Sequence, residues 1–202
     1  MIKTVIFDLG KVLIPFDFSR GYRAMEPYCD YPAAEIPKRI GATDLVHRFE
    51  TGLVEPHDFV EELTRMLALR VDYQQFCEIW SSIFLPGPLV PDSLVAGIGE
   101  RYRLLVLSNT NAIHFGMVRQ SYPILRHFHD LVLSYEVKAM KPAPAIYQAA
   151  IARARCRPAE CFFVDDIPAY VEGARRQGID AVQFESCAQL ERDLAARDIR
   201  WS

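Results

Sequence analysis

Short apolar runs recur along the chain and are separated by longer stretches with helical periodicity. The runs occupy residues 4–7, 104–107, 131–133, 161–164 and, with a weaker pattern, 181–184. Strands that are covered on both faces have this continuous apolar character, and helical patterns between them are typical of parallel strands joined by crossover helices. The sequence therefore predicts an α/β fold built on a Rossmann-like, doubly wound parallel sheet.

The connection between the first two runs is far longer than the others. About 95 residues separate these runs, whereas later crossovers take roughly 15 to 30, and structureless loops of such length are uncommon in compact domains. After Pro56, apolar residues at positions 59, 63, 66 and 67 recur at the spacing of one helix face. Residues 44–49 and 71–84 have similar patterns. The connection therefore predicts an inserted helical unit.

Proline and glycine at residues 86–88 mark the return of the chain to the sheet. No internal repeat or low-complexity tract complicates the division of the chain. We predict a core made of residues 1–14 and 89–202, with a helical cap of residues 15–88 inserted into it.

Composition narrows the classes of function. The chain has 202 residues, half of them hydrophobic, and 23 basic against 26 acidic side chains give a net charge of −3. This balance, with no lysine or arginine block, disfavours a nucleic-acid partner. No run approaches the roughly 18 apolar residues that span a bilayer, which disfavours a membrane protein. Monomer and weak dimer fit the sequence equally well.

The five cysteines are scattered and odd in number, and Asp8 interrupts the first apolar run early, which a secretory signal would not do. We expect reduced thiols in a cytoplasmic protein. A metal pair formed by Cys156 and Cys161 with His127 or His129 is an alternative, but these residues lack the paired spacing of zinc sites.

Polar residues follow the ends of the predicted strands. In open α/β sheets, ligands bind beyond the carboxyl ends of the strands. The residues found there, or in the loops that follow, are Asp8, Leu9 and Gly10 after the first strand, Ser108 and Asn109 after the second, Lys141 after the third, and Asp165 and Asp166 after the fourth. We expect these groups to converge on one site.

This set of groups suits attack by a carboxylate on a phosphoryl group, which forms an aspartyl-phosphate. The two reactants repel each other, and a divalent cation with hard oxygen ligands, such as Mg²⁺, screens that repulsion. A lysine supplies fixed positive charge, and hydroxyl and backbone N–H groups hold the phosphate oxygens. The sequence therefore favours phosphoryl transfer at the predicted site.

Four segments, in this order, resemble the four motifs of the haloacid dehalogenase-like (HAD) hydrolase superfamily. They are residues 5–8, 107–111, 141–142 and 163–166, and the insertion after the first resembles the superfamily's helical C1-type cap. Within the superfamily, the chain resembles small bacterial phosphatases that include glucose-1-phosphatase-like enzymes. The resemblance implies an Mg²⁺-dependent phosphatase that hydrolyses a small phosphate monoester, such as a hexose 1-phosphate.

The resemblance also implies a role for each motif residue. Asp8 is expected to be the nucleophile and a ligand of Mg²⁺, with the backbone carbonyl of Gly10 as a second ligand. Asp166 is the expected carboxylate ligand from the fourth motif, with Asp165 as a neighbouring or alternate ligand.

The remaining motif residues are expected to hold the phosphate. Ser108 and the amide of Asn109 bind its oxygens, together with the backbone of Leu9 and Gly10. Lys141 balances the charges of Asp8 and the phosphate and is preferred over Lys138, which lacks a following proline.

The sequence departs from the family pattern near the nucleophile. Most phosphatases of the superfamily have a general acid, an aspartate, at the position of Gly10, although the glucose-1-phosphatase-like group also has glycine there. We hypothesise that the leaving group is acidic enough to depart without a proton donor, which favours hexose 1-phosphates over hexose 6-phosphates. Lys11 and Tyr170 are also unusual for their motifs, and a pairing of Lys11 with Asp8 would weaken metal binding.

Two other functions remain open from the sequence. A 2-haloacid dehalogenase uses the same nucleophile on carbon without a metal, and the acidic pair 165–166 argues against it. A catalytically weak module that binds a phosphorylated metabolite is the second alternative.

Several polar residues outside the motifs have ordinary structural interpretations. Asp17 is expected to cap the first cap helix rather than to replace the missing acid. His47, Arg48 and Glu50 are expected on a solvated helix face rather than against a substrate. For His114, a place at the site and a place in a first helical turn remain equally open.

Overall fold

Five parallel strands form a single sheet, as the apolar runs predict. In the computed structural model, which describes residues 1–202, they are β1 (Thr4–Phe7), β2 (Arg103–Ser108), β3 (Asp130–Leu133), β4 (Cys161–Asp165) and β5 (Asp180–Gln183). The strand order is β3-β2-β1-β4-β5, so the first strand lies in the centre and pairs with β2 and β4. The prediction of a doubly wound parallel α/β sheet is confirmed, and the carboxyl ends of the three central strands are neighbours.

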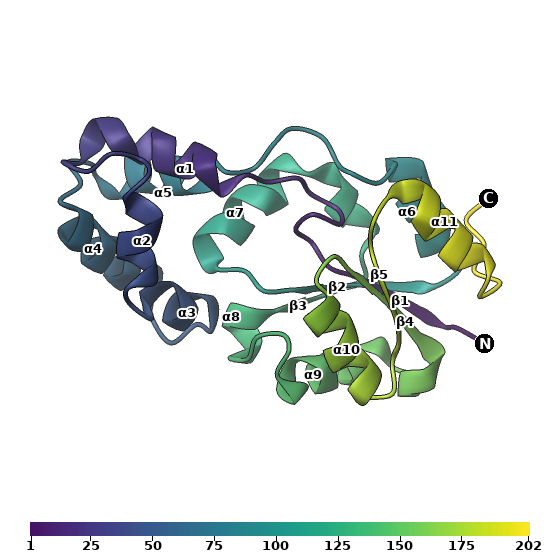
Figure 1. The fold of residues 1–202 in the computed structure, drawn as a ribbon. Helices are drawn as coiled ribbons and strands as arrows, with labels where there is room; N and C mark the ends of the chain where they lie inside the picture. Colours follow the sequence, from purple (N-terminus) through teal and green to yellow (C-terminus); the bar gives the residue numbers. More distant parts are fainter.

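Helices cover both faces of the sheet (Figure 1). One layer contains α6 (Asp92–Gly99), α7 (Ala112–Ser121) and α11 (Cys187–Ala195), and the other contains α9 (Pro144–Ala154) and α10 (Pro168–Arg176). Alternate strand residues pack against the two helix layers, since Val5 and Phe7 belong to one hydrophobic cluster and Ile6 belongs to the other. This two-sided burial explains why the strands have apolar runs without polar alternation.

Short elements complete the connections of the core. In the core they are α8 (Ser134–Val137) and the 3-10 helices Pro123–His127 and Pro158–Glu160. A further 3-10 helix, Glu26–Tyr28, lies in the insertion. No helix of the chain combines the length and the apolar composition needed to cross a membrane.

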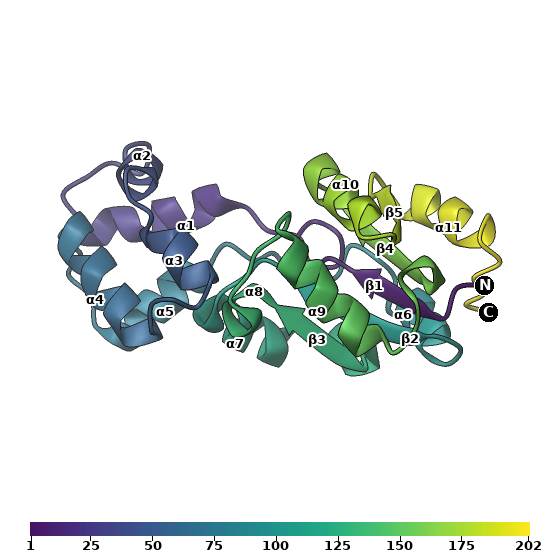
Figure 2. The ribbon, with the colours of Figure 1, turned by 90° about the horizontal axis from the view of Figure 1, so that it is seen from below.

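The insertion folds into five helices, which we call the cap helices. They are α1 (Phe18–Met25), α2 (Ile36–Gly41), α3 (Leu45–Glu50), α4 (Pro56–Leu67) and α5 (Tyr73–Ser81). They enclose a separate hydrophobic cluster of 15 buried residues and lie beyond the carboxyl end of β1, opposite the chain termini (Figures 1 and 2). The cap helices therefore cover the edge of the sheet where the motif residues gather.

The observed helices agree with the predicted ones except at their ends. Asp17 caps α1 by accepting a hydrogen bond from the N–H of Ser19 at 2.9 Å, as expected. The pattern at 71–84 gives a shorter helix, because Asp72 accepts a hydrogen bond from the N–H of Gln75 at 2.8 Å and fixes the helix start after itself.

Two connections hold the cap helices against the core. The two segments that link the insertion to the core pair with each other. The N–H of Asp17 donates to the carbonyl of Ile83 at 2.8 Å. Farther out, Lys138 Nζ donates to the carbonyl of Gly52, which has a φ of +63°. A side chain at position 52 would collide with the carbonyl oxygen of Tyr135, so this contact requires glycine.

We predict that the cap cluster contributes strongly to stability. Leu63, on α4, is fully buried, whereas Leu53 is 66% exposed. Leu63→Ala should lower the free energy of unfolding by about 2–5 kcal/mol, because it removes buried methyl groups and leaves a cavity. The matched Leu53→Ala should change it by less than about 0.5 kcal/mol. Urea unfolding of the two variants checks this, and equal losses would contradict it.

Candidate active site

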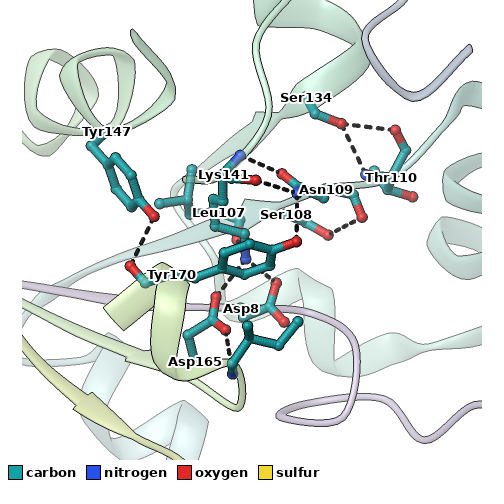
Figure 3. Close-up of polar contacts among 11 residues, drawn as sticks. Asp8, Leu107, Ser108, Asn109, Thr110, Ser134, Lys141, Tyr147, Asp165 and Tyr170 are labelled. Carbon is teal, nitrogen blue, oxygen red and sulfur yellow. Dashed lines mark hydrogen bonds and ion pairs between the residues drawn. The ribbon is translucent and has the colours of Figure 1, made fainter. Parts of the chain in front are cut away.

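The motif residues meet at the carboxyl edge of the sheet (Figure 3). Asp8 follows β1 directly, Ser108 ends β2 and Asp165 ends β4. Because β1 pairs with both other strands, their ends lie side by side. Lys141, in the loop between α8 and α9, reaches into the same place. The predicted convergence of these side chains is therefore present in the fold.

Lys141 binds the three strand ends together. Its Nζ lies 2.6 Å from Asp8 Oδ1, 2.6 Å from Asp165 Oδ2 and 3.0 Å from the carbonyl oxygen of Leu107. These three acceptors use all three N–H donors of the ammonium group. Burial lowers the pKa of Lys141, but the charges of Asp8 and Asp165 outweigh this effect, so its pKa lies above the ordinary value. Lys141 is thus a fixed positive charge.

Asp8 is buried and carries a strongly shifted pKa. Burial is the largest cause and raises its pKa to about 7, opposed by the charge of Lys141 and reinforced by that of Asp165. A strongly shifted pKa that results from burial and specific charged partners is typical of functional sites. Asp8 is therefore held in place by Lys141 with one oxygen left for other partners.

Three carboxylates form a cluster that can hold a cation. Oxygen atoms of Asp8, Asp165 and Asp166 all lie within 4.8 Å of one another. Burial and the charge of Asp165 raise the pKa of Asp166. When all three carboxylates are ionised, one ammonium leaves two negative charges, and the raised pKa values of Asp8 and Asp166 indicate that a further cation is needed to keep them ionised. A divalent cation neutralises these two charges. Hard oxygen donors of this kind suit Mg²⁺.

The hydrogen bonds of the cluster distinguish its members. Asp165 uses one oxygen for Lys141 and the other for the N–H of Ile167, at 2.9 Å, which positions the start of α10. Asp166 has no comparable side-chain bond, and the carbonyl of Gly10 accepts none of the backbone hydrogen bonds. Asp8, Asp166 and Gly10 therefore have oxygens available for a metal, whereas both carboxylate oxygens of Asp165 already accept hydrogen bonds.

Several donors near Asp8 are free to receive an anion. The N–H groups of Leu9, Gly10 and Asn109 donate to no backbone carbonyl, and that of Leu9 also lies close enough to the Asp8 carboxylate to act on its pKa. Ser108 is 2% exposed, and its hydroxyl lies 3.4 Å from the carbonyl of Asn109, a long and weak hydrogen bond. These groups make a ring of donors of the kind that binds phosphate oxygens.

The side chain of Asn109 has a different role from the one first expected for its amide. Its Oδ1 accepts from the N–H of Lys141 at 2.8 Å, and its Nδ2 donates to the carbonyl of Lys141 at 3.0 Å. The same Nδ2 donates to the hydroxyl of Tyr170 at 3.3 Å. The side-chain amide thus positions Lys141, and the backbone N–H of Asn109 is the group left for an anion.

Tyr170, unusual for the fourth motif, completes the surroundings of Lys141. Its ring centroid lies 5.1 Å from Lys141 Nζ, within the range of a cation–π contact. The hydroxyl of Tyr147, on α9, donates to the carbonyl of Tyr170 at 2.8 Å and fixes the start of α10. Tyr170 therefore shields the lysine from solvent.

The space where most phosphatases of the superfamily carry an acid is filled by an aromatic ring. A Cβ at Gly10 would lie 2.6 Å from Phe16 Cε1. Asp8 pairs with Lys141 and not with Lys11, whose Nζ lies 5.3 Å from the centroid of the Phe16 ring and whose charge acts to lower the pKa of Asp166. Phe16 thus excludes a larger residue at position 10 and draws Lys11 away from the nucleophile.

A cavity opens beside these groups, between the sheet edge and the cap helices. Its volume is about 60 Å³, and its walls include Gly10, Ser108, Phe18, Glu50 and His114. Phe18, Glu50 and His114 also line a second cavity of about 290 Å³ among the cap helices. The site therefore continues from the strand ends into the cap.

The structure gives the surroundings of three further residues considered in the sequence analysis. His114 is buried, with Nε2 3.0 Å from the carbonyl of Trp80, and burial lowers its pKa to about 4, so it is a neutral wall of the cavity. Lys138 contacts the cap rather than Asp8. Glu50 is partly buried and lines both cavities, so the expectation of a solvated position for it is wrong.

The cysteine and histidine alternative is not favoured by the contacts of these residues. The Sγ atoms of Cys156 and Cys161 lie 3.5 Å apart. His129 Nδ1 accepts from the N–H of Leu104 at 3.0 Å, and His127 faces Asp92 at 3.1 Å. The ring of His129 is thus engaged by the backbone, and that of His127 faces an exposed carboxylate.

Four residues of the site carry no motif signal in the sequence. Ser134, which exchanges hydrogen bonds of 2.9 Å with the backbone of Thr110, and Tyr147 support the motif loops from neighbouring elements. Phe16 and Glu50 come from the insertion. Outside the motifs, only Glu50 has a signal in the sequence, because it lies with two other polar residues, His47 and Arg48, on a short helix that could contact a substrate.

Comparison with known proteins gives this geometry a family. Residues 2–178 match the family of haloacid dehalogenase-like hydrolases. A D-ribitol-5-phosphate phosphatase of Bacteroides thetaiotaomicron is 24% identical over 96% of this chain and 97% of its own length. Phosphatase MT3486 of Mycobacterium tuberculosis is 29% identical over 98% of this chain and 94% of its own length.

A solved structure shares the fold closely. The HAD family enzyme from Bacteroides thetaiotaomicron, in complex with magnesium and inorganic phosphate, has a TM-score of 0.83 and 28% identity, covering 92% of this chain and 96% of its own. An L-2-haloacid dehalogenase from Xanthobacter autotrophicus, with 21% identity and a TM-score of 0.64, shares the fold alone. The chain belongs to the haloacid dehalogenase-like hydrolases.

Proposed function

We propose that the protein is an Mg²⁺-dependent phosphatase that hydrolyses small phosphate monoesters through an aspartyl-phosphate on Asp8. The observation that carries this proposal is the arrangement around Lys141. It holds the carboxylate of Asp8 beside a ring of free N–H donors, in a cluster with two excess negative charges. Such a site is built to bring a nucleophilic carboxylate, a cation and a phosphate together.

The proposed reaction has two steps on the same carboxylate. The free oxygen of Asp8 attacks phosphorus, the bond to the alcohol oxygen breaks, and the phosphoryl group is transferred to Asp8. Water then attacks phosphorus and releases inorganic phosphate from Asp8. Lys141 balances charge in both steps, and the N–H groups of Leu9, Gly10 and Asn109, with the hydroxyl of Ser108, hold the oxygens of the transferred group.

The residues present fit a magnesium ion. The cluster offers carboxylate oxygens of Asp8 and Asp166 and the carbonyl of Gly10, with Asp165 in support. Bound there, the ion supplies positive charge that lets an anionic nucleophile approach an anionic phosphate. The two negative charges that Lys141 leaves uncompensated favour a divalent ion over a monovalent one.

The substrate enters from the side of the cap. We propose that residues 1–14 and 89–202 form the catalytic core and residues 15–88 the cap, which excludes bulk water from the transferred group. A sugar or polyol phosphate is the favoured class, supported by the name of the ribitol-5-phosphate phosphatase relative. The cytoplasmic location and the monomeric or weakly dimeric state stay predictions from the sequence.

The dehalogenase alternative is less favoured. Attack on the carbon of a haloacid needs no metal, and the two excess negative charges near Asp8 would repel a haloacid carboxylate. A non-catalytic binding module is disfavoured because Lys11 does not pair with the nucleophile.

Phosphate release is expected to depend on both the metal and the nucleophile. Wild type should release inorganic phosphate from 4-nitrophenyl phosphate in the presence of Mg²⁺, and a chelator should abolish the release. Asp8→Asn should reduce it to background, because the amide does not attack phosphorus. Asp58→Asn, an exposed change on α4, is the matched control and should keep wild-type activity. Full activity of Asp8→Asn would overturn the proposed function.

Gly10 is expected to be required for packing against Phe16. Gly10→Ala should lower the free energy of unfolding by about 1–3 kcal/mol, because its methyl group overlaps the Phe16 ring. Gly116→Ala, in a helix where a Cβ meets nothing within 4 Å, should instead stabilise the protein by up to about 1 kcal/mol. Thermal unfolding of both variants measures this, and a stabilising Gly10→Ala would contradict the packing account.

A further inference from the structure

The active site lacks a proton donor at the place where the core of such enzymes carries one. Position 10 is glycine, and the ring of Phe16 occupies the space that an acid there would need. Asp17 is the next carboxyl along the chain, but it caps α1 in an exposed position, and its hydrogen bonds from Ser19 lower its pKa. A proton donor, if the site has one, must come from elsewhere.

Glu50 is the carboxyl that the fold brings to this cavity. It ends α3 and lines the cavity of about 60 Å³ whose other walls include Gly10, Ser108 and Asn109. A cavity of about 10–15 Å³ holds one water, so this space has room for several atoms of a bound group. Glu50 therefore shares a cavity with three of the residues expected to hold the phosphate.

Glu50 also faces the space available to the leaving group. The second cavity, of about 290 Å³, is lined by Glu50 together with Phe18, Met25, Trp80 and Ile83. Glu50 shares Phe18, Ile83 and His114 as neighbours in both cavities. It thus stands at the junction of the two cavities, between the groups expected to hold the phosphate and the interior of the cap.

The surroundings of Glu50 favour its protonated form. Burial raises its pKa to about 7, and no ion pair or side-chain hydrogen bond to it is present in the chain. The titratable groups that share its cavities are His114 from α7, held neutral by burial, and Tyr22 from α1. On its own helix, Arg48 pairs with Asp44, and on the core side Lys138 donates to the carbonyl of Gly52.

We propose that Glu50 is the general acid of the phosphatase and protonates the departing alcohol oxygen. This inference rests on the proposed function. As the phosphorus–oxygen bond of the ester breaks and the bond to Asp8 forms, the Glu50 proton moves to the alcohol oxygen, and the alcohol leaves neutral. In the second step the Glu50 carboxylate takes a proton from the attacking water, which restores the acid. The acidic leaving group expected from the sequence is then not required.

The test compares leaving groups in wild type and in Glu50→Gln. One substrate is 4-nitrophenyl phosphate, whose phenolate leaves without a proton. The other is the aliphatic ester that wild type hydrolyses fastest in a panel of sugar and polyol phosphates. Glu55→Gln, an exposed change at the start of α4, is the matched control, and circular dichroism checks folding.

Glu50→Gln should lower kcat/KM for the aliphatic ester by about 10²–10⁴-fold, the usual contribution of a general acid, and kcat/KM for the aryl ester by less than about threefold. The comparison uses kcat/KM because this ratio reports departure of the alcohol and not the later hydrolysis of the aspartyl-phosphate, in which Glu50 acts on both substrates. Equal losses on both substrates would overturn the proposal, since they would indicate a positioning role. Hydrolysis of the aryl ester alone by wild type would also overturn the proposal. It would favour instead the hypothesis that only an acidic leaving group departs from this site. Failure of wild type on both esters would instead contradict the proposed function.

The pH profile of wild type gives a second readout that needs no variant. A general acid works while it is protonated, so kcat/KM for the aliphatic ester should fall as pH rises through about 7, near the pKa of Glu50. The aryl ester should not show this fall, and Asp8 affects both substrates alike. Profiles with the same fall for both esters would contradict the assignment.

Discussion

A buried lysine ammonium between two aspartates is the interaction on which the site depends. Lys141 has three acceptors from three different strands, with both carboxylate contacts at 2.6 Å. Removing one partner from such a buried arrangement leaves an unpaired charge and costs about 3–5 kcal/mol. The lysine therefore fixes the strand ends relative to one another, and the side chains of Asn109 and Tyr170 in turn fix the lysine.

The charges left over after this pairing account for the ligands that the site would take. Lys141 offsets one of three clustered carboxylates, and the remaining two negative charges call for a divalent cation. The free N–H groups after Asp8 and at Asn109 then face the phosphate oxygens. Nucleophile, cation and anion are thus balanced by a small set of groups on three adjacent strand ends.

The proton donor that we infer belongs to the cap rather than to the core. Phe16 fills the usual place of an acid, whereas Glu50 lies at the junction of the two cavities. The contact of α3 with the core, through Gly52 and Lys138, holds that helix against the site. An acid carried by the cap would couple closure over the substrate to departure of the alcohol.

Most of the fold and the motif positions could be predicted from the sequence because they depend on local patterns. Apolar runs locate the strands, and strand ends locate Asp8, Ser108 and Asp165. The roles of Phe16 and Glu50 could not be predicted in this way, because they depend on how the cap helices pack against the core. The same holds for Asn109, whose side chain is engaged by Lys141 across 32 residues of chain.

The most direct test of the account is to identify the residue that carries the phosphoryl group during turnover. Protein mixed with 4-nitrophenyl phosphate and Mg²⁺ is quenched in acid, reduced with borohydride and digested, and the peptides are mapped by mass spectrometry. Reduction converts an aspartyl-phosphate to homoserine, and the account predicts this conversion at position 8. Conversion at another aspartate, or phosphate release with Asp8 unchanged in every trapped sample, would contradict it.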